Sequence, residues 1–255
     1  MKYHSRPTTA VQMDVGLEWY FMKGSVISVG YFFKDLDEVI GNEVRLDAIC
    51  NPIAVGDFTP PLCLGGERPL VDEIRWVNLK GGKIQGVEVA IQHNATWLPK
   101  PFHGLGVTAN YAYQDGDRDS SFTIPAAFRT PGNSEGPLNF RRLSEHSYNV
   151  TVFYQRPRYR WSWRLRYTWR SSYLIEESSD VANGQPLYRD DRGQLNASTS
   201  YRITRLDAPV TVTLFFQGVN LMKSRNAETS LFDSGPLVRV RDTDRRLTVG
   251  ASARF

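Results

Sequence analysis

The chain has 255 residues, of which 41% are hydrophobic, 23% charged and 12% aromatic, a composition that excludes a disordered or low-complexity protein. Its formal net charge of +4 is too small to require a nucleic acid as partner. The longest stretch without a charged residue, 208–222, has 15 residues, whereas a membrane-spanning helix needs about 20, so helical membrane proteins are excluded. A membrane β-barrel is not excluded, because its strands need only about 9–11 residues.

Five segments in the first part of the chain alternate apolar and polar residues with a period of two. In chain order these segments are residues 11–19, 27–33, 87–91, 105–113 and 148–154. In the first of them, Val15 and Leu17 alternate with Asp14 and Glu18. A β-strand places such alternating residues on opposite faces of a sheet, so each segment is predicted to be a strand.

The clearest alternation lies in the sixth segment, residues 159–173. Its odd positions hold Tyr159, Trp161, Trp163, Leu165, Tyr167 and Trp169. Its even positions include Arg160, Arg164, Arg166 and Arg170. A helix would scatter both sets around its circumference, whereas a strand places the aromatic rings on one face and the arginines on the other. Nucleic-acid binding is disfavoured, because it needs cations and stacking rings on one surface.

Three further segments, residues 195–203, 210–216 and 247–255, show the same period, and no convincing helical pattern occurs. The sequence therefore predicts an all-β chain with nine antiparallel up-and-down strands. The connections between these strands are alternately short and long. The short ones are 22–25, 98–104, 156–158 and 205–209, and the long ones are 41–83, 116–146, 175–193 and 222–245. Short periplasmic turns and long extracellular loops alternate in this way in outer-membrane barrels, so the pattern predicts a transmembrane β-barrel segment.

In such a barrel the apolar face of each strand meets lipid and the polar face meets the lumen. Aromatic residues near the strand ends, such as Trp97, Tyr113 and Tyr154, agree with the aromatic girdles of a barrel. The candidate lumen-facing residues are Asp14, Glu18, Glu88, Asn110, Arg160, Arg164, Arg166 and Arg170. The arginines are expected to form ion pairs with acidic residues of a plug or of other strands, or else to line a passage for a polar solute.

Two alternatives fit parts of the pattern. A soluble carbohydrate-binding β-sandwich would bury the same aromatic face as its core. A complete small porin-like barrel would explain the loops, but bacterial single-chain barrels have even strand numbers and this chain has nine predicted strands. The sequence has no GxSxG, HExxH or P-loop pattern and no Cys/His cluster, so neither an enzyme nor a metal or cofactor site is expected.

Several segments resemble TonB-dependent outer-membrane receptors, in particular the branch common in Xanthomonas and Caulobacter relatives. They are DVGLEWYF (14–21), VGYFFKDL (29–36), GGKIQGVE (81–88), GLGVTANY (104–111) and LTVGASARF (247–255). The resemblance covers essentially the whole chain. It implies the C-terminal part of a barrel of about 22 strands, with the plug domain and the early strands absent from residues 1–255. No apolar segment of a secretory signal occurs near residue 1.

The resemblance also implies a function and partners. Such receptors take up a scarce solute across the bacterial outer membrane, with energy relayed through TonB to the plug, and the branch favours carbohydrates over iron chelates. The expected partners are outer-membrane lipid, the TonB complex, the barrel assembly machinery and a small solute, without a nucleic acid. The last strand resembles the C-terminal signal that the assembly machinery recognises, carried by Leu247, Val249, Ala251, Ala253 and Phe255.

Two features of the long connections yield separate predictions. Cys50 and Cys63 lie in the longest connection, and a disulfide between them is expected because the periplasm and the cell surface are oxidising. Residues 115–119 resemble the start of a calcium-binding loop. The required Gly and Glu are replaced by Ser120 and Ala126, so this segment is predicted to be a solvated loop.

Overall fold

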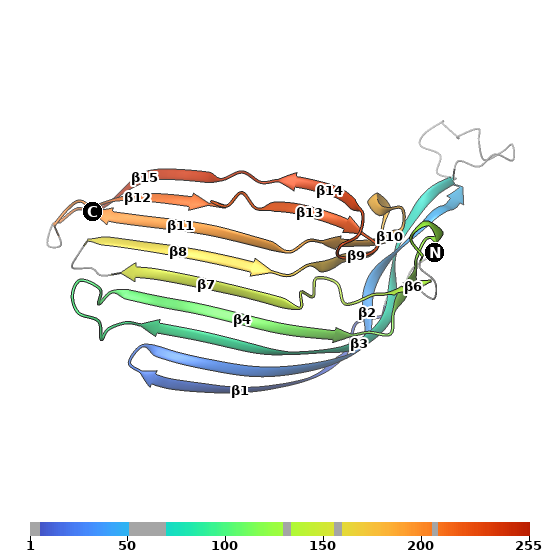
Figure 1. Cartoon of the computed structure of the whole chain (residues 1–255), viewed down its shortest axis with the longest axis horizontal. Coiled ribbons are helices and arrows are strands. Elements are labelled where there is room, and N and C mark those ends of the chain that lie inside the picture. Colours follow the sequence, from blue (N-terminus) through green and yellow to red (C-terminus); the bar gives the residue numbers. More distant parts are fainter. Residues whose placement is uncertain (1–5, 51–69, 130–133, 156–159, 206–208) are drawn as a thin grey trace.

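The computed structural model describes residues 6–50, 70–129, 134–155, 160–205 and 209–255; for 42–50, 70–75 and 180 it describes the backbone alone. Nine strands form one antiparallel sheet in which neighbours along the chain are also neighbours in space (Figure 1). They are β1 (Ala10–Met22), β2 (Ser25–Cys50), β3 (Leu70–Asn94), β4 (Leu105–Asp117), β7 (His146–Gln155), β8 (Trp161–Arg170), β11 (Arg192–Arg202), β12 (Thr211–Val219) and β15 (Arg246–Arg254). The nine strands predicted from the alternation are thereby confirmed. No described helix is long and apolar enough to cross a membrane.

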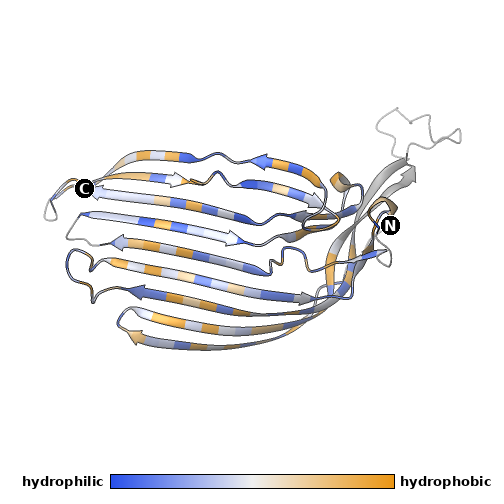
Figure 2. Cartoon of the chain, viewed as in Figure 1, coloured by the Kyte–Doolittle hydropathy of each residue, from blue (hydrophilic) through white to orange (hydrophobic). Residues whose placement is uncertain are grey.

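The register of the sheet aligns the apolar positions of neighbouring strands into continuous rows. One row crosses six strands through Leu17, Val29, Val89, Tyr111, Tyr148 and Trp169. Figure 2 shows the resulting alternation of apolar and polar residues along the strands. The side chains of Val11, Leu17 and Val249 on this apolar face are 75%, 72% and 78% exposed. A soluble sandwich would cover this face with a second sheet, whereas in the described part of the chain it is open.

Four further strands form a second antiparallel sheet, with the order β14-β13-β10-β9. They are β9 (Tyr173–Ser179), β10 (Gln185–Arg189), β13 (Arg225–Ser230) and β14 (Leu237–Asp242). A small hairpin of β5 (Ser121–Thr123) and β6 (Glu135–Pro137) and short 3-10 helices at Ala126–Phe128 and Asp180–Ala182 are the remaining elements of the described residues. Apart from Tyr173 and Leu174 at the start of β9, these elements lie in segments predicted as long connections, at the end of the sheet opposite the short turns (Figure 1).

The prediction of a polar connection over 41–83 was wrong at both ends. β2 continues to Cys50 and β3 begins at Leu70, with Glu38 pairing with Lys80 and Gly41 with Val77. Backbone pairing extends past the apolar band because ladder hydrogen bonds do not depend on what the side chains face. Beyond that band the two faces of a strand no longer meet lipid and lumen, so the alternation that reveals a strand in the sequence is not required there.

Most buried apolar side chains lie at the end of the sheet that carries the long connections. They include Ile124, Leu138, Phe140, Leu174, Leu187 and Leu231, each no more than 6% exposed. As far as the described residues show, the nine-stranded sheet is largely open on both faces, so water-excluding packing is concentrated where the second sheet joins the first. The long connections therefore form a structured cap with a core of its own.

Candidate functional site

The polar face of the nine-stranded sheet holds seven of the eight candidate lumen-facing residues. Cross-strand partners share a face, so the register can be followed from strand to strand. A row through Glu18, Ser28, Ala90, Asn110, Asn149 and Thr168 places Glu18 and Asn110 on the face opposite the apolar rows. Asp14, Glu88, Arg164, Arg166 and Arg170 lie in parallel rows of the same face.

The eighth candidate, Arg160, lies just before β8 and not within it. Its backbone has φ 57°, in the left-handed region, and its Nη1 donates to the Ile203 carbonyl at 3.3 Å. The regular alternation that predicted the direction of this side chain therefore begins one residue later, at Trp161.

The acidic and basic candidates on the polar face lie far apart across the sheet. Asp14 and Glu18 are on β1 and Glu88 is on β3, whereas the arginine row is on β8, with β4 and β7 between them. Among the described residues no ion pair joins the two groups; Arg166 instead donates from Nη2 to Asn149 Oδ1 at 3.5 Å. Ion pairing of the arginines with a plug stays a prediction.

At the end of the polar face nearest the long connections, arginines gather around an open hollow of about 450 Å³. Arg170, the last residue of β8, and Arg192, the first of β11, are cross-strand partners, and Arg142 reaches the same hollow from the connection before β7. The other lining residues are Gln114, Ser144, Ser147, Asn149, Thr168, Trp169 and Gln194. The hollow is thus positive and rich in hydrogen-bonding groups.

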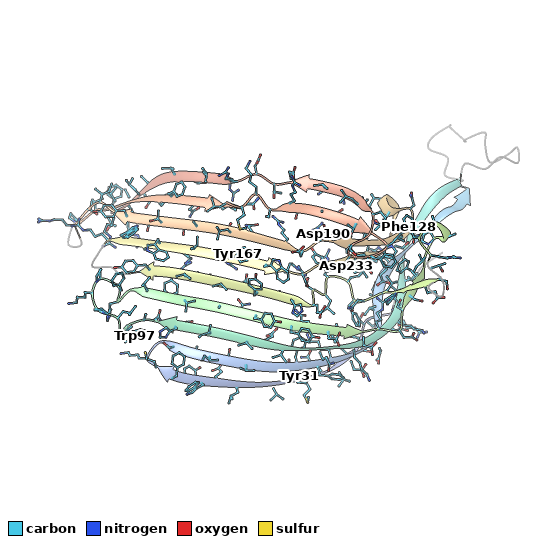
Figure 3. The ribbon with its side chains drawn as sticks, in the orientation of Figure 1. Tyr31, Trp97, Phe128, Tyr167, Asp190 and Asp233 are labelled. Carbon is cyan, nitrogen blue, oxygen red and sulfur yellow. The ribbon has the colours of Figure 1, made fainter. Side chains whose placement is uncertain are left out.

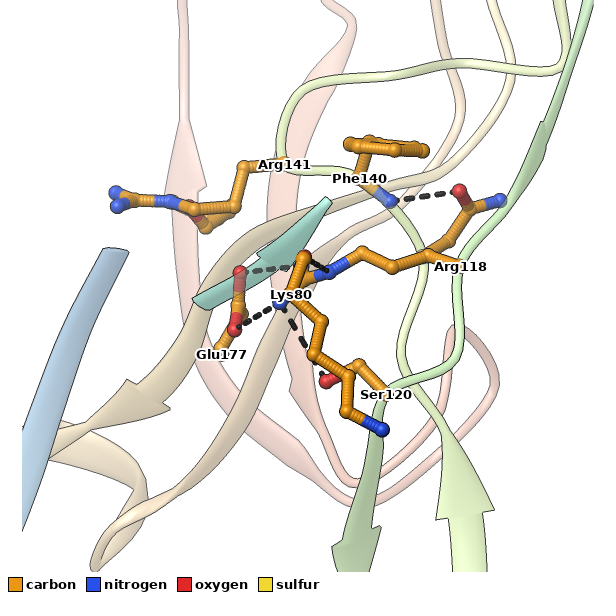
Figure 4. A network of polar contacts seen from close by, with 8 residues as sticks. Lys80, Arg118, Ser120, Phe140, Arg141 and Glu177 are labelled. Carbon is orange, nitrogen blue, oxygen red and sulfur yellow. Dashed lines mark hydrogen bonds and ion pairs between the residues drawn. The ribbon is translucent and has the colours of Figure 1, made fainter. Parts of the chain in front are cut away.

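The long connections are joined to one another by a buried ion pair between Arg118 and Glu177. Arg118 Nη1 donates to Glu177 Oε1 at 2.7 Å and Nη2 to Oε2 at 3.0 Å, and the two side chains are 0% and 6% exposed. Arg118 Nε also donates to the Lys80 carbonyl at 2.9 Å, so one guanidinium links three segments of the chain (Figure 4). The prediction that residues 115–119 form a solvated loop was wrong in part: the aspartates are exposed, but β4 extends to Asp117 and Arg118 is buried.

A second buried carboxylate, Glu228 on β13, joins strands of the small sheet. Its side chain is 3% exposed and accepts from Arg189 Nη2 at 2.7 Å and from Arg239. Burial by itself raises the pKa of the Glu228 carboxyl, but the hydrogen bonds from Arg189 and Arg239 outweigh it, and the net pKa is lowered. Glu228 is therefore ionised at neutral pH and holds β10, β13 and β14 together.

The lowered pKa of Glu228 predicts how acid affects the small sheet. A carboxyl whose pKa falls on folding stabilises the fold above its unfolded pKa of about 4.3, and this stability is lost as the pH falls through the lower folded value. We expect protection of the β13 amides from hydrogen exchange to decrease in this acidic range. The Glu228→Gln variant should have lower protection at neutral pH and a flatter pH dependence. Equal pH profiles for the two proteins would contradict this role of Glu228.

One carboxyl and one phenol with raised pKa values lie at the same end of the molecule. Burial, followed by the negative charges of Asp191 and Asp233, raises the pKa of Asp190. Burial, with Asp233 and Glu177, raises the pKa of Tyr188 to about 12. Figure 3 shows Asp190 and Asp233 at this end and Trp97 at the short-turn end. Among the described residues no group of three or more His, Cys, Asp or Glu side chains is placed to hold a metal ion.

The residues that organise the cap were missed in the sequence because no short motif marks them. Arg118 follows β4, Glu177 lies on β9 and Glu228 on β13, far apart in the chain, and only the fold brings their partners together. An arginine inside a segment otherwise made of Asp and Gly was the one available indication, and it does not by itself distinguish a buried arginine from an exposed one.

Other predicted features are not tested by the described contacts. The side chain of Cys50 and all of Cys63 lie outside the described residues, so their disulfide stays a prediction. Leu247, Val249, Ala251 and Ala253 lie on β15 and Phe255 follows it, with Leu247, Val249 and Phe255 largely exposed. Recognition of this strand by the assembly machinery also stays a prediction.

Comparisons with known proteins agree with this geometry. Residues 6–221 match the family described as TonB dependent receptor-like, β-barrel. No match is found among curated protein sequences. Two similar solved structures are mutant forms of the ferric enterobactin receptor PfeA from Pseudomonas aeruginosa, each 16% identical, with TM-scores of 0.53 and 0.52. Each match covers 97% of this chain but 31% of the receptor chain, so this chain spans about a third of those proteins.

Proposed function

The chain belongs to the TonB-dependent receptor family of β-barrels, integral proteins of the outer membrane, and on this premise we propose that it forms part of the wall of a receptor that imports a scarce solute. Members of this family are transporters and not enzymes. The observation that carries the proposal is the separation of faces: nine strands in sequential order expose one continuous apolar face and one continuous polar face. Lipid covers the first face and the solute passes along the second.

The sheet also supports the proposal that residues 1–255 are the C-terminal part of a larger barrel. β1 and β15 each have one edge without a partner strand in the described part of the chain. Unpaired backbone groups cost several kcal/mol each in lipid, so a stable barrel needs further strands to close these edges. We assign the plug domain and the early strands to regions outside this sequence. TonB would act through that plug, and the barrel assembly machinery would recognise β15.

A more specific proposal concerns the chemical class of the imported solute. The matched structures are receptors for ferric enterobactin, but at 16% identity they support the fold alone. The resemblance to the Xanthomonas and Caulobacter branch favours a carbohydrate. The amide, hydroxyl and guanidinium groups on the polar face suit a strongly polar solute of this kind.

Uptake measurements test the proposed function. Cells that express the full-length receptor should accumulate its solute only when TonB is present, because the plug moves by energy relayed through TonB. We expect radiolabelled oligosaccharide uptake to fall to the background of receptor-free cells when TonB is deleted. A ferric siderophore in a parallel assay serves as the alternative substrate. Accumulation that is equal with and without TonB would contradict the proposal.

The loop lengths predict which end of the sheet faces outward. Ser234 lies exposed in the connection between β13 and β14, and Lys23 lies exposed in the turn between β1 and β2. With long connections outside the cell, a membrane-impermeant thiol reagent should label Ser234→Cys in intact cells and leave Lys23→Cys unlabelled until the outer membrane is opened. Labelling of Lys23→Cys alone in intact cells would reverse the topology.

A further inference from the structure

The cross-strand pair of Arg170 and Arg192 places two positive charges side by side on the polar face. The two residues are direct Cα partners at the junction of β8 and β11. Like charges directly opposite each other destabilise a sheet. The other arginines on β8 avoid this arrangement, since Arg164 lies opposite Ser198 and Arg166 opposite Asn196. Among the arginines of β8 this repulsion is thus confined to Arg170, at the end of the polar face nearest the long connections.

Both guanidiniums of this pair are oriented by neutral groups. Arg170 donates from Nε to Ser144 Oγ at 2.8 Å and from Nη2 to the Arg142 carbonyl at 3.0 Å, and its Cζ lies 4.0 Å from the centre of the Tyr173 ring. Arg192 donates from Nη1 to Asn226 Oδ1 at 2.8 Å and from Nη2 to Gln194 Oε1 at 3.2 Å.

In the described part of the chain neither Arg170 nor Arg192 has a carboxylate partner. Arg118, Arg189 and Arg239 at the same end of the molecule each bind a glutamate. The positive charge of the Arg170–Arg192 pair is therefore held in place without being neutralised.

A third guanidinium completes the positive lining of the hollow. Arg142 has φ 61°, a strained conformation for a residue with a side chain, and its backbone N–H donates to the Leu174 carbonyl at 2.7 Å. Its side chain is exposed and has no hydrogen-bond or ion-pair partner among the described residues. Asp190 and Asp191 precede Arg192 in the chain, but neither lines the hollow.

We propose that the hollow between Arg142, Arg170 and Arg192 is a binding subsite for a negatively charged oxygen group, a carboxylate or a phosphate, carried by the imported solute. The proposal rests on the proposed function and adds the charge of the solute to it. Guanidinium forks bind such groups through paired charge-assisted hydrogen bonds, and an anion between Arg170 and Arg192 removes their repulsion. Ser147, Asn149 and Thr168 beside it suit the hydroxyls of a polar solute, such as an acidic sugar.

Calorimetry on the purified full-length receptor tests this subsite. The probes are citrate and inorganic phosphate as anions and maltose as a neutral molecule. Arg170→Gln with Arg192→Gln should weaken citrate binding about tenfold or more, because two charge-assisted contacts are lost while the side chains stay polar. The control is Lys223→Gln with Arg225→Gln, which removes the same charge from exposed positions outside the hollow and should leave binding unchanged. A heat-modifiable gel shift checks that each variant is folded.

Three results would overturn the subsite: no binding of citrate or phosphate by the wild-type receptor, equal loss in both double variants, or binding of maltose with the same affinity as citrate. If a carboxylate of the plug occupies the hollow instead, the wild type will bind neither anion. In the Arg170→Gln, Arg192→Gln variant the plug will then be cleaved more readily by added protease. Binding by the purified receptor needs no TonB. If the purified receptor binds no anion while uptake in cells still depends on TonB, the proposed subsite is contradicted and the proposed function is not.

Discussion

Replacing Glu177 with Gln in the full-length receptor should destabilise the cap of long connections by about 3–5 kcal/mol, because it leaves the Arg118 charge buried without its partner. The Arg118 side chain is 0% exposed and binds both carboxylate oxygens of Glu177. Water cannot replace the lost carboxylate without opening the packing around it. Hydrogen exchange should show the loss as faster exchange in β9 and at the end of β4, with the short-turn end unaffected.

A neighbouring surface ion pair provides the control for the Glu177 experiment. Lys80 Nζ lies 2.6 Å from Asp119 Oδ2, but these side chains are 71% and 92% exposed. Asp119→Asn should therefore change the exchange rates little, since exposed pairs contribute about 0–1 kcal/mol. A double variant, Arg118→Met with Glu177→Leu, should recover part of the stability because it removes both charges. If Glu177→Gln costs no more than Asp119→Asn, the buried pair does not hold the cap together.

The Arg118 contacts also bear on how the cap moves. One guanidinium joins the end of β4 to β9 through Glu177 and to β3 through the Lys80 carbonyl. Arg141 Nε adds a contact to the Ile175 carbonyl at 2.9 Å, and the Arg142 N–H adds one to Leu174. Connections tied in this way are expected to move as one body and not as separate flaps.

The strands of the nine-stranded sheet could be predicted because lipid favours apolar side chains on one face and the lumen favours polar side chains on the other. Trp161, Trp163, Leu165, Tyr167 and Trp169 share one face, and that face is apolar over the whole strand. The candidate lumen-facing residues followed from the same alternation, and seven of the eight lie on one face of the sheet.

The cap could not be predicted in the same way. Its strands have 3 to 7 residues, too few to establish a regular period, and Leu174 and Leu187 are buried in them. The extensions of β2 and β3 lie beyond the apolar band, where alternation is no longer required. Arg118 and Arg192 acquire their roles from partners that are distant in the sequence, and no local spacing contains that information.

Replacing Leu165 with Arg should cost about 2–4 kcal/mol of barrel stability, the value for a charge near the bilayer midplane. Leu165 is 42% exposed on the apolar face, with Val152 and Ala197 as its cross-strand partners. It lies midway between Trp161 and Trp169, which are about 26 Å apart along the strand at the usual rise per residue. With the strand tilt of a barrel, these rings lie near the two edges of an apolar band about 25 Å tall.

A substitution at the adjacent residue is the control, because it tests whether the strand tolerates a change on its polar face. Arg166 points to the polar face, so Arg166→Gln should leave the folded fraction nearly unchanged, because a wet lumen tolerates polar exchange. The measurement is the fraction of receptor in outer-membrane vesicles that shows a heat-modifiable gel shift. Leu165→Arg should reduce that fraction sharply, whereas Leu165→Phe, which keeps the position apolar, should leave it close to that of the wild type. If Leu165→Arg assembles as well as Leu165→Phe, the apolar rows do not face lipid.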